Sequence, residues 1–172
     1  FNSNPKITEK GFYNGYDFII KNVNSDSQNS TNYKENTNNY ISGLLQLNSS
    51  LPLIKENDKY KKILKPKVAL KISPNNNTKN ISKNVNRLDV NNIYNLNRLS
   101  ANDTLEGGLS FAYGNEFIIS NKEDLSEVFS LKLANNIRLN NNNDLPKNNQ
   151  MGAKTSNFLS EIKYSPTQFL TT

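Results

Sequence analysis

The sequence predicts an all-β fold, an antiparallel transmembrane β-barrel of the up-and-down kind. Apolar side chains alternate with small or polar ones along several long segments, and polar, Asn-rich runs separate these segments. A soluble sandwich buries the apolar face of such a strand, whereas a membrane barrel turns it toward lipid. Length favours the barrel, because residues 104–120 and 125–139 alternate over about 15 residues each, against five or six in soluble sheets.

About seven strands are expected along the chain, separated by polar turns. In the first three, residues 12–22, 40–49 and 64–73, apolar side chains recur at every second position with some interruptions. Pro66 leaves a gap in the hydrogen-bond ladder near the start of the third segment. The fourth segment, residues 88–96, is expected to gather apolar side chains on one face in the same way.

The fifth segment, residues 104–120, shows the alternation most regularly. Its apolar positions are Leu105, Leu109, Phe111, Tyr113, Phe117 and Ile119, and the positions between them include Glu106, Ser110, Ala112 and Glu116. The sixth segment, residues 125–139, places Phe129 and Leu131 opposite Lys132 and Arg138. Residues 157–164 form the seventh. Consecutive hairpins of this kind are what an up-and-down barrel requires.

The composition excludes several classes of function. Only 34% of the residues are hydrophobic and the mean hydropathy is -0.74, which is little for a soluble core. The net charge is +6, but the basic run lacks stacking aromatics and Arg forks, so we expect a solvated lysine surface and no nucleic-acid partner. That run comprises Lys59, Lys61, Lys62, Lys65, Lys67 and Lys71.

The sequence shows no recognisable set of catalytic residues. The chain contains no Cys and no His, which excludes disulfides, thiolate or imidazole metal sites and the usual nucleophile-base pairs within it. Glu123 and Asp124 are adjacent, but they lie in a polar turn where both are expected to be solvated. We therefore expect neither enzymatic activity nor a cofactor.

The ends of the sequence indicate a piece of a longer protein. The chain starts at Phe1 without a Met and stops at Thr172 within a strand-like segment. No apolar run approaches the roughly 20 residues of a membrane helix, but several reach the roughly 9 to 11 residues of a tilted membrane strand.

Three stretches in order resemble a known family. They are NRLDVNNIYNLNRLSANDTLEGGLSFAYGNEF at 86–117, EVFSLKLANNIRL at 127–139 and NDLPKNNQMGAKTSNFLSEIKYSP at 143–166. Together with LPLIK and LKPKVALKISP upstream, they are similar to the C-terminal barrel of the outer-membrane protein LptD, also called OstA or organic solvent tolerance protein. The likeness is strongest over residues 51–172, so residues 1–172 are expected to be part of that barrel, with no complete second domain.

The resemblance implies lipopolysaccharide (LPS) assembly in the outer membrane of a Gram-negative bacterium. Such a barrel is plugged by an LptE-like lipoprotein, receives LPS from a periplasmic bridge and releases it sideways into the outer leaflet, while an inner-membrane ATPase supplies the work. Lipopolysaccharide, the plug, the bridge and the outer-membrane lipids are then the expected partners. Two other classes stay open: a different outer-membrane barrel, such as a porin or receptor, and a soluble β-rich surface binding protein.

On this interpretation each face of the sheet has a role. The polar face would line the lumen, with candidate residues Glu106, Ser110, Glu116, Lys132 and Arg138. The apolar face would contact lipid, with candidate residues Leu109, Phe111, Tyr113, Phe117, Phe129 and Leu131. The charged candidates also have a simpler explanation, because opposite charges on neighbouring strands pair and stabilise a sheet.

Overall fold

The computed structural model describes residues 1–172 except 31–32, 34–37, 75–80, 84–86, 100–103 and 166–172. Eight strands and one short 3-10 helix, η1 (Asn148–Gln150), are assigned in this part of the chain. The strands are β1 (Lys6–Ile7), β2 (Tyr13–Ser25), β3 (Asn38–Ser50), β4 (Leu53–Glu56), β5 (Tyr60–Ser73), β6 (Gly108–Asn121), β7 (Glu127–Arg138) and β8 (Leu159–Tyr164).

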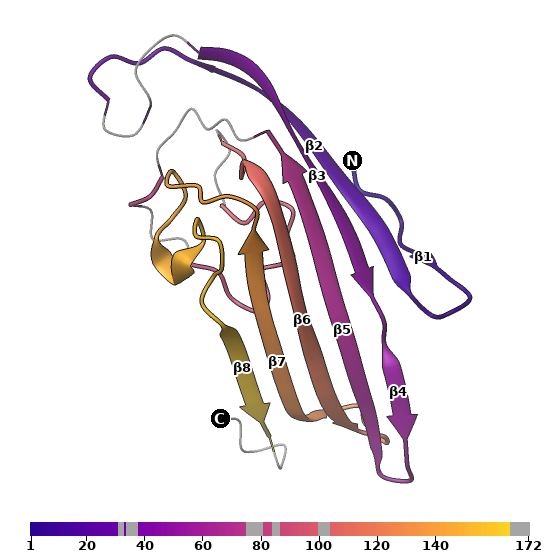
Figure 1. Ribbon diagram of the computed structural model, residues 1–172. Helices are drawn as coiled ribbons and strands as arrows, with labels where there is room; N and C mark the ends of the chain where they lie inside the picture. Colours follow the sequence, from indigo (N-terminus) through magenta and orange to yellow (C-terminus); the bar gives the residue numbers. More distant parts are fainter. Residues whose placement is uncertain (31–32, 34–37, 75–80, 84–86, 100–103, 166–172) are drawn as a thin grey trace.

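All eight strands form one antiparallel sheet, which confirms the predicted fold class. The order is β1-β2-β3-β5-β6-β7-β8, with β4 also paired to β5 (Figure 1). β3 and β4 keep the same register against β5, since Leu45 lies opposite Ile72 and Leu53 opposite Leu64. The described sheet is open, with β1 and β8 at its two edges, as expected for part of a larger barrel.

Six of the expected segments correspond to β2, β3, β5, β6, β7 and β8, and the remaining one, at residues 88–96, is wrong. These residues form turns instead of a strand. The Asp89 carboxylate accepts hydrogen bonds from the backbone N–H groups of Asn91 (2.8 Å) and Asn92 (2.7 Å). Short polar side chains that bond the local backbone in this way compete with a strand ladder. The short strands β1 and β4 were not predicted, and β6 begins at Gly108, after Glu106.

The two faces of the sheet differ in chemistry along every long strand. Leu70 of β5, Phe111 of β6 and Ile137 of β7 lie side by side across the sheet on one face. This surface, the apolar face, is open: Phe111 is 39% and Ile137 44% exposed. On the opposite, covered face, Ser110 and Ala112 are each only 2% exposed.

The connections between strands differ in length at the two ends of the sheet. β4–β5 and β6–β7 are joined by short turns at one end, the lower end in Figure 1. The connections 26–37, 74–107 and 139–158 are longer and belong to the other end. None of the helices in the described residues is long and apolar enough to cross a membrane.

Candidate functional site on the covered face

The β5–β6 connection folds back over one face of the sheet. Its described residues 81–83, 87–99 and 104–107 are called the cover here. Leu88, Ile93 and Leu99 of the cover are at most 2% exposed and belong to one apolar cluster with Ala69 and Ala112 of the strands. Because these strand residues are small, the cover can approach the sheet closely and exclude water from its polar side chains.

An ion cluster lies between the cover and the strands. Glu106, at the end of the cover, is 2% exposed and accepts hydrogen bonds from two arginines. Arg98 of the cover donates from Nε to Oε2 at 2.7 Å and from Nη2 to Oε1. Arg138 of β7 donates from Nη1 to Oε1 at 2.6 Å. This fork geometry is the strongest way to hold a carboxylate with guanidinium groups.

The same cluster joins the cover to β6 and β7 through neutral side chains. The Arg98 guanidinium donates to Asn136 Oδ1 at 2.9 Å and to Ser110 Oγ at 3.0 Å. Each of these residues is at most 3% exposed. Arg98 therefore carries both the charge and the hydrogen bonds that attach the cover to the strands.

Lys71 of β5 adds a third cation. Its ammonium group lies 3.8 Å from Glu106 Oε2 and donates to the Leu96 carbonyl at 3.2 Å. Burial alone would raise the pKa of Glu106, but Arg98, Lys71 and Arg138 outweigh it and hold that pKa well below its usual range. In the described part of the chain, two arginines and Lys71 thus surround one carboxylate, and the two arginines alone give a formal surplus of one positive charge (two minus one).

A second polar group lies nearer the short turns. Lys67 of β5 forms an ion pair with Glu116 of β6 at 2.5 Å, and Lys132 of β7 pairs with Glu161 of β8 at 3.0 Å. Lys132 also donates to Asn91 Oδ1 of the cover at 2.9 Å. Tyr94 of the cover lies beside this group, where burial and the charge of Glu116 raise its pKa to about 12.

The polar residues predicted to line a lumen all lie on the covered face. Glu106, Ser110 and Arg138 meet in the ion cluster, and Glu116 and Lys132 lie directly opposite each other farther along β6 and β7. The charged members are paired, as the simpler explanation expects. The predicted lipid-facing residues lie on the apolar side of β6 and β7. Contact with lumen or lipid stays a prediction.

Two residues of the ion cluster were missed from the sequence. Arg98 carried one available signal, since it is one of three arginines in a chain whose other 18 basic residues are lysines. Arginine is preferred over lysine where a buried carboxylate needs a planar fork of donors. Lys71 was expected on the solvated surface, and this is wrong: it is 2% exposed.

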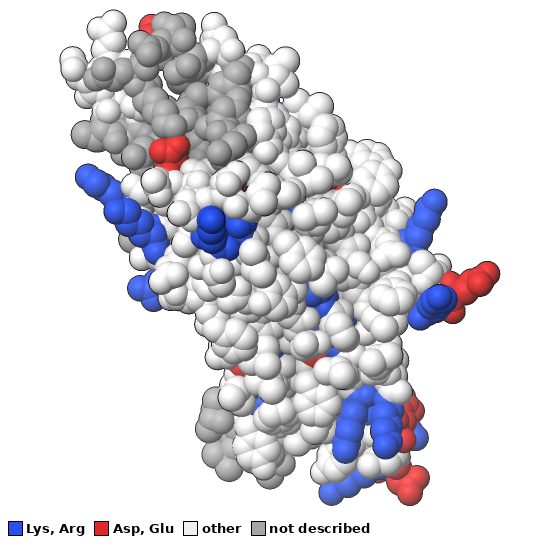
Figure 2. All heavy atoms as spheres, in the orientation of Figure 1, with Lys and Arg blue, Asp and Glu red and all other residues white. Residues whose placement is uncertain are grey.

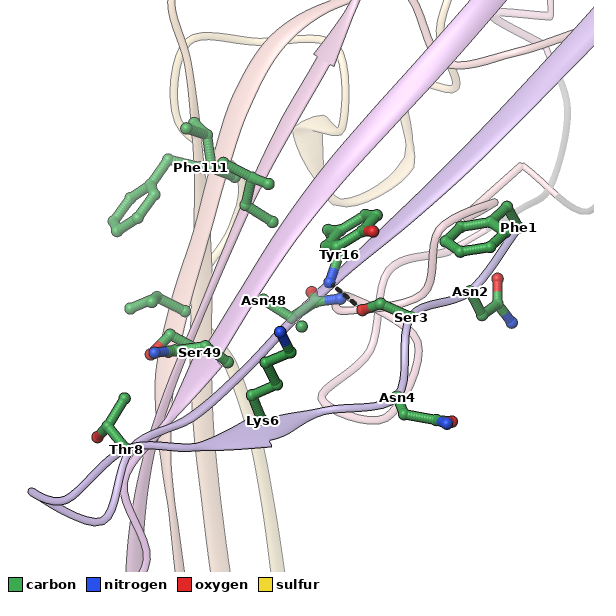
Figure 3. A pocket seen from close by; sticks show the side chains of 15 residues that line it. Phe1, Asn2, Ser3, Asn4, Lys6, Thr8, Tyr16, Asn48, Ser49 and Phe111 are labelled. Carbon is green, nitrogen blue, oxygen red and sulfur yellow. Dashed lines mark hydrogen bonds between the residues drawn. The ribbon is translucent and has the colours of Figure 1, made fainter.

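A wide hollow of about 960 Å³ lies on the apolar face, beside the N-terminal segment (Figure 3). Its lining includes Tyr16 of β2, Leu47 of β3 and Phe111 of β6, and the Phe1 ring is stacked on that of Tyr16 with 5.9 Å between the ring centres. The segment is fixed by backbone pairing and by a hydrogen bond of 2.7 Å from the Tyr16 N–H to Ser3 Oγ (Figure 3). The hollow suits an apolar occupant. Its lining residues include no pair of side chains that could act as a general acid and a general base.

The described residues include no group of three or more acidic side chains placed to hold a metal ion. The site combines a polar face that carries surplus positive charge with an apolar face on the other side of the sheet. The chain was also compared with known protein families. The sequence profile of LptD, described as LPS transport system D, matches residues 11–172. No curated protein and no solved structure matches the chain.

Proposed function

Because the chain belongs to the LptD family, with a role in lipopolysaccharide transport and assembly, we propose that its sheet is part of the wall of an outer-membrane barrel. Lipopolysaccharide passes through the lumen of this barrel into the outer leaflet. The activity is physical guidance, and no covalent bond is made or broken.

The observation that carries the proposal is the division of the sheet into an open apolar face and a polar face. Leu109, Phe111 and Tyr113 of β6 are 37–40% exposed on one side, and water is a poor solvent for so continuous an apolar surface. A bilayer removes that cost, because lipid takes the place of a protein core. The polar face then lies toward the barrel interior.

The surplus of positive charge supports lipopolysaccharide as the molecule that is moved. Its headgroup carries sugars and phosphates, which match the cations and hydrogen-bond donors of the covered face. Arg138 and Lys132 would attract the phosphates, and Ser110 would bond to sugars. In the present arrangement the cover occupies this face, so passage requires the cover to move away from β6 and β7. An LptE-like plug and a periplasmic bridge are the partners that this function needs.

Photo-crosslinking in cells tests the proposal at two adjacent residues of β5. A photoreactive residue at position 65 of the full-length protein faces the polar side, and one at position 64 faces the apolar side. We expect lipopolysaccharide adducts at position 65 that disappear when the inner-membrane ATPase is inactivated. Position 64 is the matched control and should label phospholipid instead.

Each alternative class gives a different pattern. A porin or receptor would label phospholipid at position 64 without ATPase-dependent adducts at position 65. A soluble surface protein would label lipid at neither position and would be extracted without detergent. Either result would overturn the proposed function.

A further inference from the structure

Two lysines lie directly opposite each other where the apolar face ends. Lys55 of β4 is paired in register with Lys62 of β5, and two positions farther toward the middle of the sheet Leu53 is paired with Leu64. Side chains alternate between faces, so both lysines share the apolar face with these leucines. Opposed side chains of this kind have Cβ atoms about 4.5–5.5 Å apart. Both ammonium groups can therefore reach one small anion.

The part of the chain that the structure describes supplies no counterion for this pair. Like charges directly opposite each other destabilise a sheet. Lys61 forms an ion pair with Glu56 at 3.6 Å, and Lys122 lies 3.9 Å from the same carboxylate. Within the described ranges, neither the Lys55 nor the Lys62 ammonium lies within 4.0 Å of a carboxylate. An anion from outside the chain would relieve their repulsion.

The two lysines lie at the boundary of the apolar surface. The row across the sheet continues from Lys62 through Ile119 and Phe129 to Tyr164. At the short turn itself, the Lys59 ammonium lies 5.3 Å from the centre of the Tyr60 ring. In Figure 2, one cluster of charged side chains lies at the lower end of the molecule, where Figure 1 places β4 and the β4–β5 turn, and others lie at the upper left and along the right edge. Aromatic and basic side chains at such a boundary are typical of the level of lipid headgroups.

We infer that Lys55 and Lys62 clamp the phosphate of an anionic phospholipid. The inference rests on the proposed function, since it needs the apolar face in a bilayer. In outer-membrane barrels the short turns face the periplasm. The pair beside the β4–β5 turn therefore meets the inner leaflet, which is made of phospholipid. Two adjacent cations favour a headgroup with net negative charge over a zwitterionic one.

Electron spin resonance with spin-labelled lipids tests the clamp on the full-length protein in phosphatidylethanolamine vesicles. The quantity measured is the association of labelled phosphatidylglycerol relative to labelled phosphatidylethanolamine. We expect the double variant K55Q/K62Q to lower this ratio about tenfold. The matched control K10Q/K122Q removes two exposed lysines from short turns and should leave the ratio unchanged. K55R/K62R should retain it, because the charge remains.

The outcomes separate the clamp from the proposed function. If K55Q/K62Q inserts into vesicles and keeps the wild-type ratio, or if the control loses as much, the clamp is overturned while the barrel stands. Insertion is measured separately by protection from protease. If the wild-type protein fails to insert, both the clamp and the proposed function fail.

Discussion

Arg98 and Glu106 form a two-pronged ion pair in which both carboxylate oxygens accept from one guanidinium group, between the cover and the strands. The side chains are 0% and 2% exposed. A buried pair of this kind is costly to break, because the partner left behind keeps an uncompensated charge.

Arg98→Lys should be strongly destabilising although it keeps the charge. A lysine cannot supply the fork that reaches Glu106, Asn136 and Ser110 together. We expect the free energy of unfolding to fall by about 1–3 kcal/mol, measured by denaturant unfolding in detergent. Arg87→Lys, at an exposed position of the same connection, should be neutral. Equal effects of the two substitutions would contradict the role given to Arg98.

Glu106→Gln should lower the free energy of unfolding more than the loss of any other described carboxylate on the covered face. It leaves Arg98, Arg138 and Lys71 buried without a negative charge, so we expect a loss of about 3–5 kcal/mol or failure to assemble. Heat-modifiability on gels measures assembly. Glu116→Gln, which breaks the partly exposed pair with Lys67, is the control and should cost about 1 kcal/mol or less. A Glu106→Gln variant as stable as this control would show that the cluster is not needed.

Acid should weaken the attachment of the cover. The cations hold the pKa of Glu106 below its usual range. The ionised Glu106 therefore contributes fully to the free energy of unfolding at any pH above the pKa of a Glu in the unfolded chain, about 4.3. That contribution is lost as the pH falls below this value toward the folded pKa. Thermal unfolding followed by circular dichroism should show that the wild type unfolds at a higher temperature than Glu106→Gln near neutral pH, and that this difference shrinks below about pH 4. A gap between the two proteins that stays constant with pH would refute this origin of the stability.

Gly114→Ala should disrupt the pairing of β6 with β7. A Cβ atom at Gly114 would lie 2.1 Å from the Leu133 carbonyl oxygen and 2.5 Å from Tyr94 Oη. Backbone atoms cannot yield by that amount, so we expect loss of assembled protein in the membrane fraction, measured by immunoblotting. Gly43→Ala is the matched control, because its Cβ would meet only ordinary contacts of 3.6 Å or more. Normal assembly of Gly114→Ala would show that β6 and β7 lie farther apart.

A charge on the apolar face should cost more near its middle than near its end. Tyr113→Arg lies near the middle of β6 (Gly108–Asn121), whereas Ile119→Arg lies level with Lys62. In a bilayer we expect a penalty of about 2–4 kcal/mol at Tyr113 and about 1 kcal/mol or less at Ile119, measured by unfolding in vesicles. In water, a side chain 40% exposed such as Tyr113 would tolerate the charge, and similar small penalties at both positions would argue against membrane insertion.

The strands could be predicted from the sequence because alternation is a local property. Alternation alone assigns Phe111 and Ser110 to opposite faces of β6, whichever strands lie beside it. The same holds for the residues of β7. The 88–96 segment could not be placed by this rule. Asp89 and Asn92 each accept a hydrogen bond from the other's backbone N–H group, and Leu88, Val90 and Ile93 are buried in the apolar cluster without forming a strand. Lys71 and Arg98 are buried because the β5–β6 connection folds back over the sheet. Their contacts with Glu106 and Asn136 form only in that folded-back arrangement, which alternation along a strand cannot predict.

The Arg98–Glu106 pair also has a consequence for the order of folding. Both residues belong to the β5–β6 connection and are only eight positions apart, whereas Arg138 is 32 positions from Glu106. Closing so short a loop costs little chain entropy, so we expect this ion pair to form before β7 is in place. The connection then brings its own counterion to the sheet, and β7 arrives at a carboxylate that is already oriented to receive it.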